Sequence, residues 1–152
     1  MKAYPDTTFL CALYRSQDNS DRALDYRANM DGPLPVSRLL LWEFRQSVRF
    51  QAFRYRQNRA AGYPLREAEK MLADLAEDMQ AGLVIHMEYD VTTILARGEQ
   101  LSKLRTPTGG HRGFDLLHVA TALELGASDF LTFDANQTAL ARAEGLATPL
   151  AS

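Results

Sequence analysis

The sequence has little cysteine, no long apolar run and no large excess of either charge, and each shortage excludes a class of protein. One cysteine in 152 residues, Cys11, excludes an internal disulfide and favours a small buried residue in a reducing compartment. No stretch approaches the ~20 apolar residues of a membrane span, and residues 1–6 hold no apolar signal-peptide core. A net charge of -2 with 46% hydrophobic residues excludes extensive disorder. We therefore expect one soluble, cytoplasmic globular domain over residues 1–152.

Several catalytic signatures are also missing. The sequence contains neither a glycine-rich phosphate loop nor a Gly-x-Ser-x-Gly nucleophile elbow. A thiol pair of Cys11 with His118 is disfavoured, because Cys11 lies within an apolar helical pattern. An aspartyl-phosphate phosphatase is disfavoured as well, because it would need a second aspartate where Thr8 stands, two residues after Asp6.

Short apolar strands alternate with amphipathic helices along the chain. The hydrophobic periodicity predicts strands at residues 3–5, 34–36, 83–87, 129–133 and 146–148. It predicts helices at residues 7–16, 20–30, 65–81, 91–104, 114–125 and 136–144, a long helix from a cap at Ser37 to about residue 58, and a loop at 106–113. Strands connected by helices form a parallel sheet with helices on both faces. The predicted fold class is therefore a three-layer α/β/α sandwich with a short-stranded, mainly parallel central sheet.

Carboxylates follow these strands at the edge where open parallel sheets bind ligands. Asp6 follows the first strand, Asp134 follows the fourth, and Asp115 comes after a loop that can bring it to the same edge. Glu43 lies two turns into the long helix among apolar neighbours, so we expect its carboxylate to be partly buried. Each aspartate has the alternative role of a helix N-cap, and Glu43 has the alternative of pairing with an arginine such as Arg38.

The convergence of these four side chains would favour a metal site. Four carboxylates cannot all stay ionised together at low dielectric without a cation. Oxygen ligands without a histidine or cysteine cluster favour Mg²⁺ or Mn²⁺ over zinc. Such a site supports in-line hydrolysis of a phosphodiester, in which the metal generates hydroxide and stabilises the departing oxygen.

Four local patterns also occur in the order and spacing of a known family. They are Asp6-Thr7-Thr8, Val36-Ser37 followed by Glu43, the helix Asp115–Gly126, and Thr132-Phe133-Asp134. On these patterns, which span nearly the whole chain, the sequence resembles a PIN domain, and within that superfamily a VapC-type toxin ribonuclease. Pro5, directly before Asp6, is a departure from the family pattern.

The resemblance implies an activity, a cofactor and partners. Asp6, Glu43, Asp115 and Asp134 would form the metal site, and RNA would be cut by water activated on Mg²⁺ or Mn²⁺. Toxins of this group are usually homodimers that a cognate antitoxin protein holds inactive.

A basic segment adds a candidate binding surface. Residues 44–66 contain no acidic residue and six arginines, so the segment carries +6 and the rest of the chain -8. Arginines interleaved with aromatic residues can bind phosphates and stack bases, or pair with an acidic partner protein. They can also form a solvated helix face whose aromatics point into the core. Arg45, Arg49 and Arg56 are the candidates for binding RNA or a partner.

Four further residues are candidates for contacting the carboxylates or the substrate. Thr8 and Thr132 can hydrogen-bond the carboxylates, or they can be ordinary turn residues. Arg112 can meet the scissile phosphate or pair with a nearby acid. His118 lies one turn after Asp115 and can face the site, although a lone helical histidine is more often structural.

The function that we favour is a metal-dependent endoribonuclease, the toxin of a toxin–antitoxin pair. One alternative is a PIN-type nuclease in RNA processing or DNA repair, which the sequence does not separate from the first. Another is a PIN-like binding module without catalysis, which the intact set of four acids disfavours.

Overall fold

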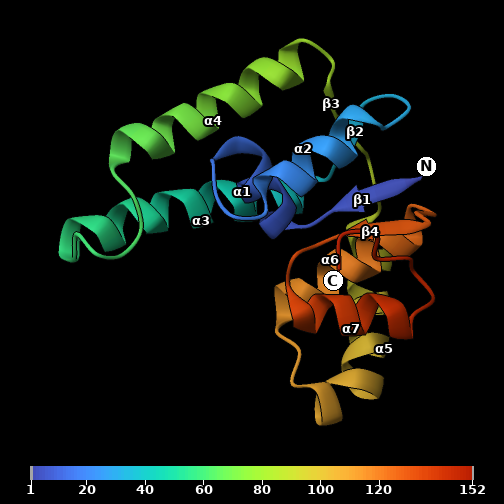
Figure 1. Ribbon diagram of the computed structural model, residues 1–152. Helices are drawn as coiled ribbons and strands as arrows, with labels where there is room; N and C mark the ends of the chain where they lie inside the picture. Colours follow the sequence, from blue (N-terminus) through green and yellow to red (C-terminus); the bar gives the residue numbers. More distant parts are fainter. Residues whose placement is uncertain (1, 152) are drawn as a thin grey trace. The chain divides into compact units, whose positions relative to one another are not determined.

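The computed structural model describes residues 2–151 and has an α/β architecture (Figure 1). Within these residues it contains four short strands and seven helices. The elements in chain order are β1 (Ala3–Pro5), α1 (Thr7–Tyr14), α2 (Ser20–Ala28), β2 (Leu34–Val36), α3 (Arg38–Gln57), α4 (Leu65–Gln80), β3 (Val84–His86), α5 (Val91–Gly109), α6 (Gly113–Glu124), β4 (Asp129–Leu131) and α7 (Ala135–Ala143). Among the described residues, no helix combines the length and apolar character needed to cross a membrane.

The chain forms two compact units, which we describe separately. The first unit combines the chain up to Phe9 with the chain from Met87 onwards, and the second unit is Leu10–His86. Each unit contains one pair of parallel strands, β1 with β4 in the first and β2 with β3 in the second. The predicted α/β class with short parallel strands is confirmed, and the four strands pair two by two.

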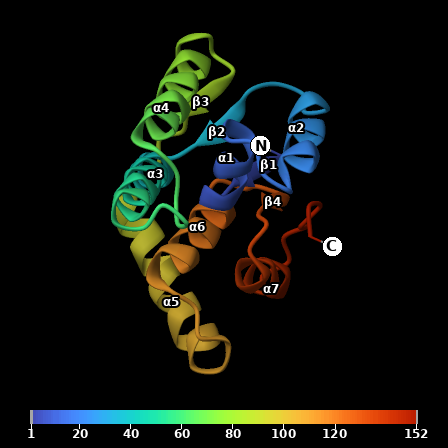
Figure 2. The same ribbon diagram turned by 60° about the vertical axis from the view of Figure 1, so that its left-hand side comes forward.

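The first unit is built around β1 and β4. Tyr4 and Phe130 are register partners on these strands, and both are fully buried. Helices α5 and α6 pack closely against each other (Figure 2). Gly98 permits this approach, because a Cβ atom there would lie 2.9 Å from a methyl carbon of Leu117 on α6.

The long helix α3 is the main element of the second unit. Ser37 caps this helix as predicted, because its hydroxyl accepts a hydrogen bond from the backbone N–H of Leu40 at 3.1 Å. Helix α4 lies alongside α3 (Figure 1). The chain between them returns through Gly62, whose φ of +67° lies in the left-handed region. A side chain at Gly62 would overlap the carbonyl oxygen of Gln51, so glycine is required there on two counts.

Several predicted element boundaries differ from the structure. The strand expected at residues 129–133 ends at Leu131, so Thr132, and not Asp134, directly follows it. The loop expected at residues 106–113 begins later, because α5 continues to Gly109 and ends where Gly110 adopts a left-handed conformation with φ +64°. Pro107 is tolerated because it lies in the last turn, where its missing N–H removes one hydrogen bond without interrupting a following helical segment. The strand expected at residues 146–148 is reduced to one parallel bridge between Asp129 and Ala147.

Candidate active site

The pairing of β1 with β4 brings Asp6 and Thr132 to one edge of the first unit. Pro5 and Leu131 are the last register partners of the two parallel strands. The next residues are therefore neighbours, and the backbone N–H of Asp6 continues the ladder by donating to the carbonyl oxygen of Leu131 at 3.0 Å. Pro5 lies within the strand and leaves this geometry regular, so the departure from the family pattern does not displace Asp6 from the strand end.

The Asp6 carboxylate is fully buried, with 0% of the residue exposed, and each of its oxygens accepts two hydrogen bonds. Oδ1 accepts from the Thr8 hydroxyl at 2.6 Å and from the Phe9 backbone N–H at 3.0 Å. Oδ2 accepts from the Thr132 hydroxyl at 2.6 Å and from the Gln137 side-chain amide at 2.7 Å. Burying a carboxylate is costly unless it is paired or hydrogen-bonded, and these four donors offset part of that cost.

The two threonine hydroxyls have fixed orientations. The Thr8 hydroxyl oxygen accepts the backbone N–H of Phe133 at 2.9 Å, and the Thr132 hydroxyl oxygen accepts that of Asp134 at 3.0 Å. Each hydroxyl therefore donates its proton to an Asp6 oxygen while its own oxygen accepts a backbone N–H, as one O–H donor and two lone pairs allow. The hydrogen bonds expected of Thr8 and Thr132 are therefore present in the structure.

Gln137 joins Asp6 to Asp134, and sequence reasoning missed it. Asp134 is the N-cap of α7, and its Oδ1 accepts a hydrogen bond from the backbone N–H of Gln137 at 2.8 Å. The side-chain amide of Gln137 donates to Asp6. A glutamine three residues after a capping residue matches the capping-box spacing, and this signal could have drawn attention to Gln137. Its side-chain oxygen Oε1 is buried and accepts no hydrogen bond within residues 2–151.

Burial controls the electrostatics of this site. Desolvation raises the pKa of Asp6 from its ordinary value of 3.8 to about 6. Hydrogen bonds from Thr132, Thr8 and the Phe9 amide act in the opposite direction. An electrostatic interaction with His118, which lies on α6 and is 1% exposed, also lowers the pKa of Asp6. A buried carboxylate with a raised pKa is typical of functional sites, and it gains from a nearby cation.

Asp115 and Asp134 are both partly exposed on helices of the first unit. Asp134 caps α7, as its alternative role predicted. Asp115 does not cap a helix, because α6 begins at Gly113 and has Arg112 at its N-cap position. Asp115 lies instead in the first turn of α6, where the helix dipole favours a negative charge. Arg112 is exposed at the start of the same helix.

Glu43 belongs to the second unit. It lies in the second turn of α3 and is partly exposed, between the exposed Trp42 and the buried Phe44. The structure therefore joins Asp6 with Asp134 through one hydrogen-bonded residue, whereas the convergence of Glu43 with the carboxylates of the first unit stays a prediction.

The donor atoms near Asp6 fit a hard divalent cation, although no ready ligand cage is formed. Among residues 2–151, no group of three or more His, Cys, Asp or Glu side chains is arranged to hold a metal ion. The donors present are carboxylate oxygens of Asp6 and Asp134, two hydroxyls and the buried Oε1 of Gln137. Oxygen donors of this kind suit Mg²⁺ or Mn²⁺. A cation beside Asp6 would stabilise the ionised carboxylate and so offset the free-energy cost of the burial that raises its pKa.

Comparisons with known proteins agree with this architecture. The family model of the PIN domain matches residues 3–143. A search of curated protein sequences finds no match.

Two solved structures resemble the chain over nearly its whole length. One is VapC20 of Mycobacterium tuberculosis, described as a toxin that cleaves the sarcin-ricin loop. It has a TM-score of 0.65 and 18% sequence identity, and the match covers 91% of this chain and 94% of that one. The other is FitAcB from Neisseria gonorrhoeae, with a TM-score of 0.59 and 17% identity, covering 96% of this chain and 95% of that one. At these identities the two structures show the fold alone.

Proposed function

The chain belongs to the PIN-domain family, and from this premise we propose that it is a metal-dependent endoribonuclease of the VapC toxin type. The observation that carries the proposal is the buried Asp6 carboxylate at the shared end of β1 and β4, linked through Gln137 to Asp134. A fold needs no fully buried carboxylate for its stability. The raised pKa of Asp6 means that its ionised form lowers the stability of the folded protein. Such a cost is typical of a site retained for function.

We assign the metal site to Asp6, Asp115 and Asp134 of the first unit with Glu43 of the second. A divalent cation held by such residues supplies an activated water and stabilises negative charge on a phosphodiester. The chain's own residues prepare the site. Gln137 and two threonine hydroxyls fix the orientation of the Asp6 carboxylate, and second-layer contacts of this kind set ligand geometry.

Two further residues have positions that suit a role at the site. His118 is buried within electrostatic reach of Asp6 and favours its ionised form. Arg112 is exposed at the N-cap of α6, three residues before Asp115, where its guanidinium is available to a substrate phosphate.

The proposal includes partners. VapC20 is described as a toxin, and its likeness to this chain over nearly the full length supports a toxin role here. A toxin of this type would work in the cytoplasm as a homodimer and would be held inactive by a cognate antitoxin.

The proposal is tested by incubating the purified chain with a mixed single-stranded RNA pool in Mg²⁺, Mn²⁺ or EDTA. Asp6→Asn and Asp115→Asn are compared with a matched control, Asp90→Asn. Asp90 is an exposed capping aspartate of α5 in the same unit, and asparagine also caps helices.

We expect cleavage in either metal, none in EDTA, loss in both site variants and wild-type cleavage by Asp90→Asn. Cleavage that persists in EDTA or in Asp6→Asn would contradict the proposal. Absence of cleavage of both the pool and total cellular RNA would favour a PIN-like binding module.

A further inference from the structure

The second half of α3 and the turn after it present exposed arginines that form no ion pair with a carboxylate of the described residues. All six charged residues of segment 44–66 are arginines, and Arg45, Arg49 and Arg56 recur at spacings of four and seven, which places them on one face of α3. Arg49, Arg56 and Arg59 are exposed, and within residues 2–151 none of the three forms an ion pair with a carboxylate. We call Arg49, Arg56 and Arg59 the basic face.

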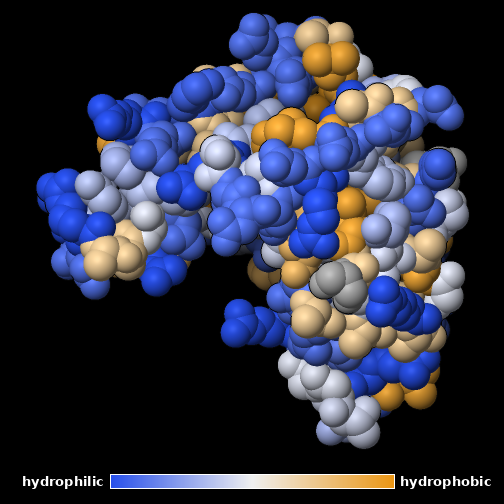
Figure 3. All heavy atoms as spheres, viewed as in Figure 1, coloured by the Kyte–Doolittle hydropathy of each residue, from blue (hydrophilic) through white to orange (hydrophobic). Residues whose placement is uncertain are grey.

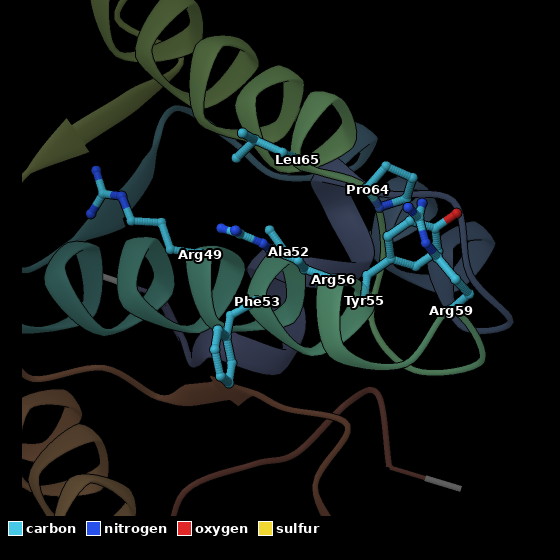
Figure 4. A pocket seen from close by; sticks show the side chains of 8 residues that line it. All are labelled: Arg49, Ala52, Phe53, Tyr55, Arg56, Arg59, Pro64 and Leu65. Carbon is cyan, nitrogen blue, oxygen red and sulfur yellow. The ribbon is translucent and has the colours of Figure 1, made fainter.

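The basic face borders a cavity of about 380 Å³ between the second half of α3 and the start of α4 (Figure 4). Figure 4 shows the side chains of Arg49 and Arg56 on the α4 side of α3, with the Arg56 guanidinium toward Leu65, and the Arg59 guanidinium against the ring of Tyr55. That guanidinium carbon lies 4.8 Å from the centre of the ring. Over α3 and α4, on the left of Figure 3, the surface is mostly hydrophilic with small paler patches.

Two exposed aromatic rings come from the same part of α3 as the basic face: Phe53 also lines the cavity, and in Figure 4 its ring extends from α3 on the side away from α4. Phe50 and Phe53 are 52% and 54% exposed, and their rings stack with centres 6.0 Å apart and an angle of 26°. The simplest expectation for α3 is that its aromatic rings are buried in the core. Phe44 is buried, but Phe50 and Phe53 are not. Exposing two aromatic rings to water is unfavourable in free energy for the unbound protein. The pair therefore suggests a ligand that covers it.

We infer that the basic face and the Phe50–Phe53 pair bind single-stranded RNA, with arginines contacting phosphates and bases stacking on the rings. The inference rests on the proposed function, because it assigns a binding surface to the RNA that the acid site would cut. Guanidinium groups match phosphate geometry, and stacking on phenylalanine accepts any base. The combination therefore holds a strand without reading its sequence.

The position of Glu43 fits this arrangement. Phe50 follows Glu43 by seven residues, so the two lie on one face of α3, about 10 Å apart along its axis. A strand bound along the second half of α3 would therefore extend toward a proposed metal ligand of the same helix.

An acidic protein segment is the competing occupant. It would use the arginines equally well, but it would fill the cavity that Leu65 and Phe53 line and would leave the Phe50 ring, which does not line that cavity, uncovered. The exposed stacked pair favours RNA, and the experiment below separates the two.

The test is RNA binding without cleavage. The anisotropy of a fluorescein-labelled single-stranded RNA of mixed sequence, about 12 nucleotides long, is measured in EDTA over a range of salt. The double variant Arg49→Gln/Arg56→Gln is compared with Arg54→Gln/Arg66→Gln. The control removes the same charge from two exposed arginines of the same segment that do not line the cavity.

We expect the first double variant to bind RNA ~10-fold more weakly at about 0.1 M salt. The slope of log binding constant against log salt concentration should fall in magnitude by ~1.4, and both effects should be smaller in the control. Phe53→Ala should weaken binding by ~5-fold or more, whereas Leu65→Ala, which trims the aliphatic wall of the same cavity, should leave it near wild type.

Equal losses in the two double variants would overturn the inference, because net charge alone would then explain binding. RNA affinity unchanged by Arg49→Gln/Arg56→Gln would overturn it as well. If a labelled polyglutamate peptide instead depended on these arginines and on Leu65, the surface would belong to an acidic protein.

The outcomes separate the inference from the proposed function. A wild-type chain that cuts RNA, with a double variant that binds and cuts equally well, refutes only the α3 surface. A wild-type chain that binds RNA through α3 but never cuts it refutes only the nuclease.

Discussion

The raised pKa of Asp6 predicts that this side chain makes the metal-free protein less stable as the pH rises. The carboxyl has a pKa of about 6 when folded and 3.8 ordinarily, so the folded state holds its proton more tightly than the unfolded state. Stability from this group is fully present below the unfolded value and is lost as the pH rises through the folded value. At ~1.4 kcal/mol per pKa unit, the full loss is about 3 kcal/mol, of which about 1 kcal/mol falls between about pH 5 and about pH 7.5.

The assay is urea unfolding in EDTA, followed by circular dichroism across this pH range. The free energy of unfolding of the wild type should fall relative to that of Asp6→Asn by about 1 kcal/mol from the acidic to the alkaline end. Asp90→Asn is the control. Hydrogen bonds from Thr93 and Thr92 lower the pKa of Asp90, so this group stays ionised throughout the range and its variant should run parallel to the wild type.

A divalent cation should reverse the effect of pH. An ion that binds only the folded, ionised site stabilises it by ~3 kcal/mol at one hundred times its dissociation constant. We expect added Mg²⁺ to raise the unfolding free energy of the wild type at about pH 7.5 and to leave Asp6→Asn unchanged. A wild type and an Asp6→Asn variant with parallel pH profiles would refute the reasoning, as would a difference of the opposite sign.

Three further predictions follow from contacts in the two units. Asp134→Asn should keep the α7 cap and unfold within ~1 kcal/mol of the wild type while losing RNA cleavage, whereas equal cleavage would make Asp134 a cap alone. Gln137→Met should keep its backbone bond to Asp134 but weaken Mn²⁺ binding ~10-fold or more in a calorimetric titration, and unchanged affinity would make the Asp6 contact incidental. Gly62→Ala should cost more unfolding free energy in urea than Gly82→Ala, which shares a positive φ but has open space around it. Placing alanine at a positive φ costs both variants ~1–2 kcal/mol of unfolding free energy. Equal losses of unfolding free energy in the two variants would refute an added clash with the Gln51 carbonyl.

The sequence predicted those parts of the site that depend on strand ends. The alternation of strands and helices placed Asp6 at a strand end, whereas the pairing of β1 with β4, which brings Thr132 to Asp6, comes from the structure. The role of Asp134 as a cap was equally accessible, because capping depends only on the following residues.

The missed features depend on tertiary packing. The bond from Gln137 to Asp6 joins residues 131 positions apart and requires α7 to turn its first-turn side chain toward β1, which periodicity does not encode. The extension of α5 through Pro107 was hidden by a composition typical of loops. The exposure of Phe50 and Phe53 was hidden because aromatic residues in a helix usually mark its buried face.

The central claim is that the carboxylates Asp6, Glu43, Asp115 and Asp134 hold one metal site, and Mn²⁺ binding followed by electron paramagnetic resonance tests it most directly. The wild type should bind Mn²⁺ that Mg²⁺ displaces, and Asp6→Asn, Asp115→Asn, Asp134→Asn and Glu43→Gln should each weaken that binding. Asp90→Asn should bind as the wild type does. Mn²⁺ binding that survives Asp6→Asn unchanged would contradict the account.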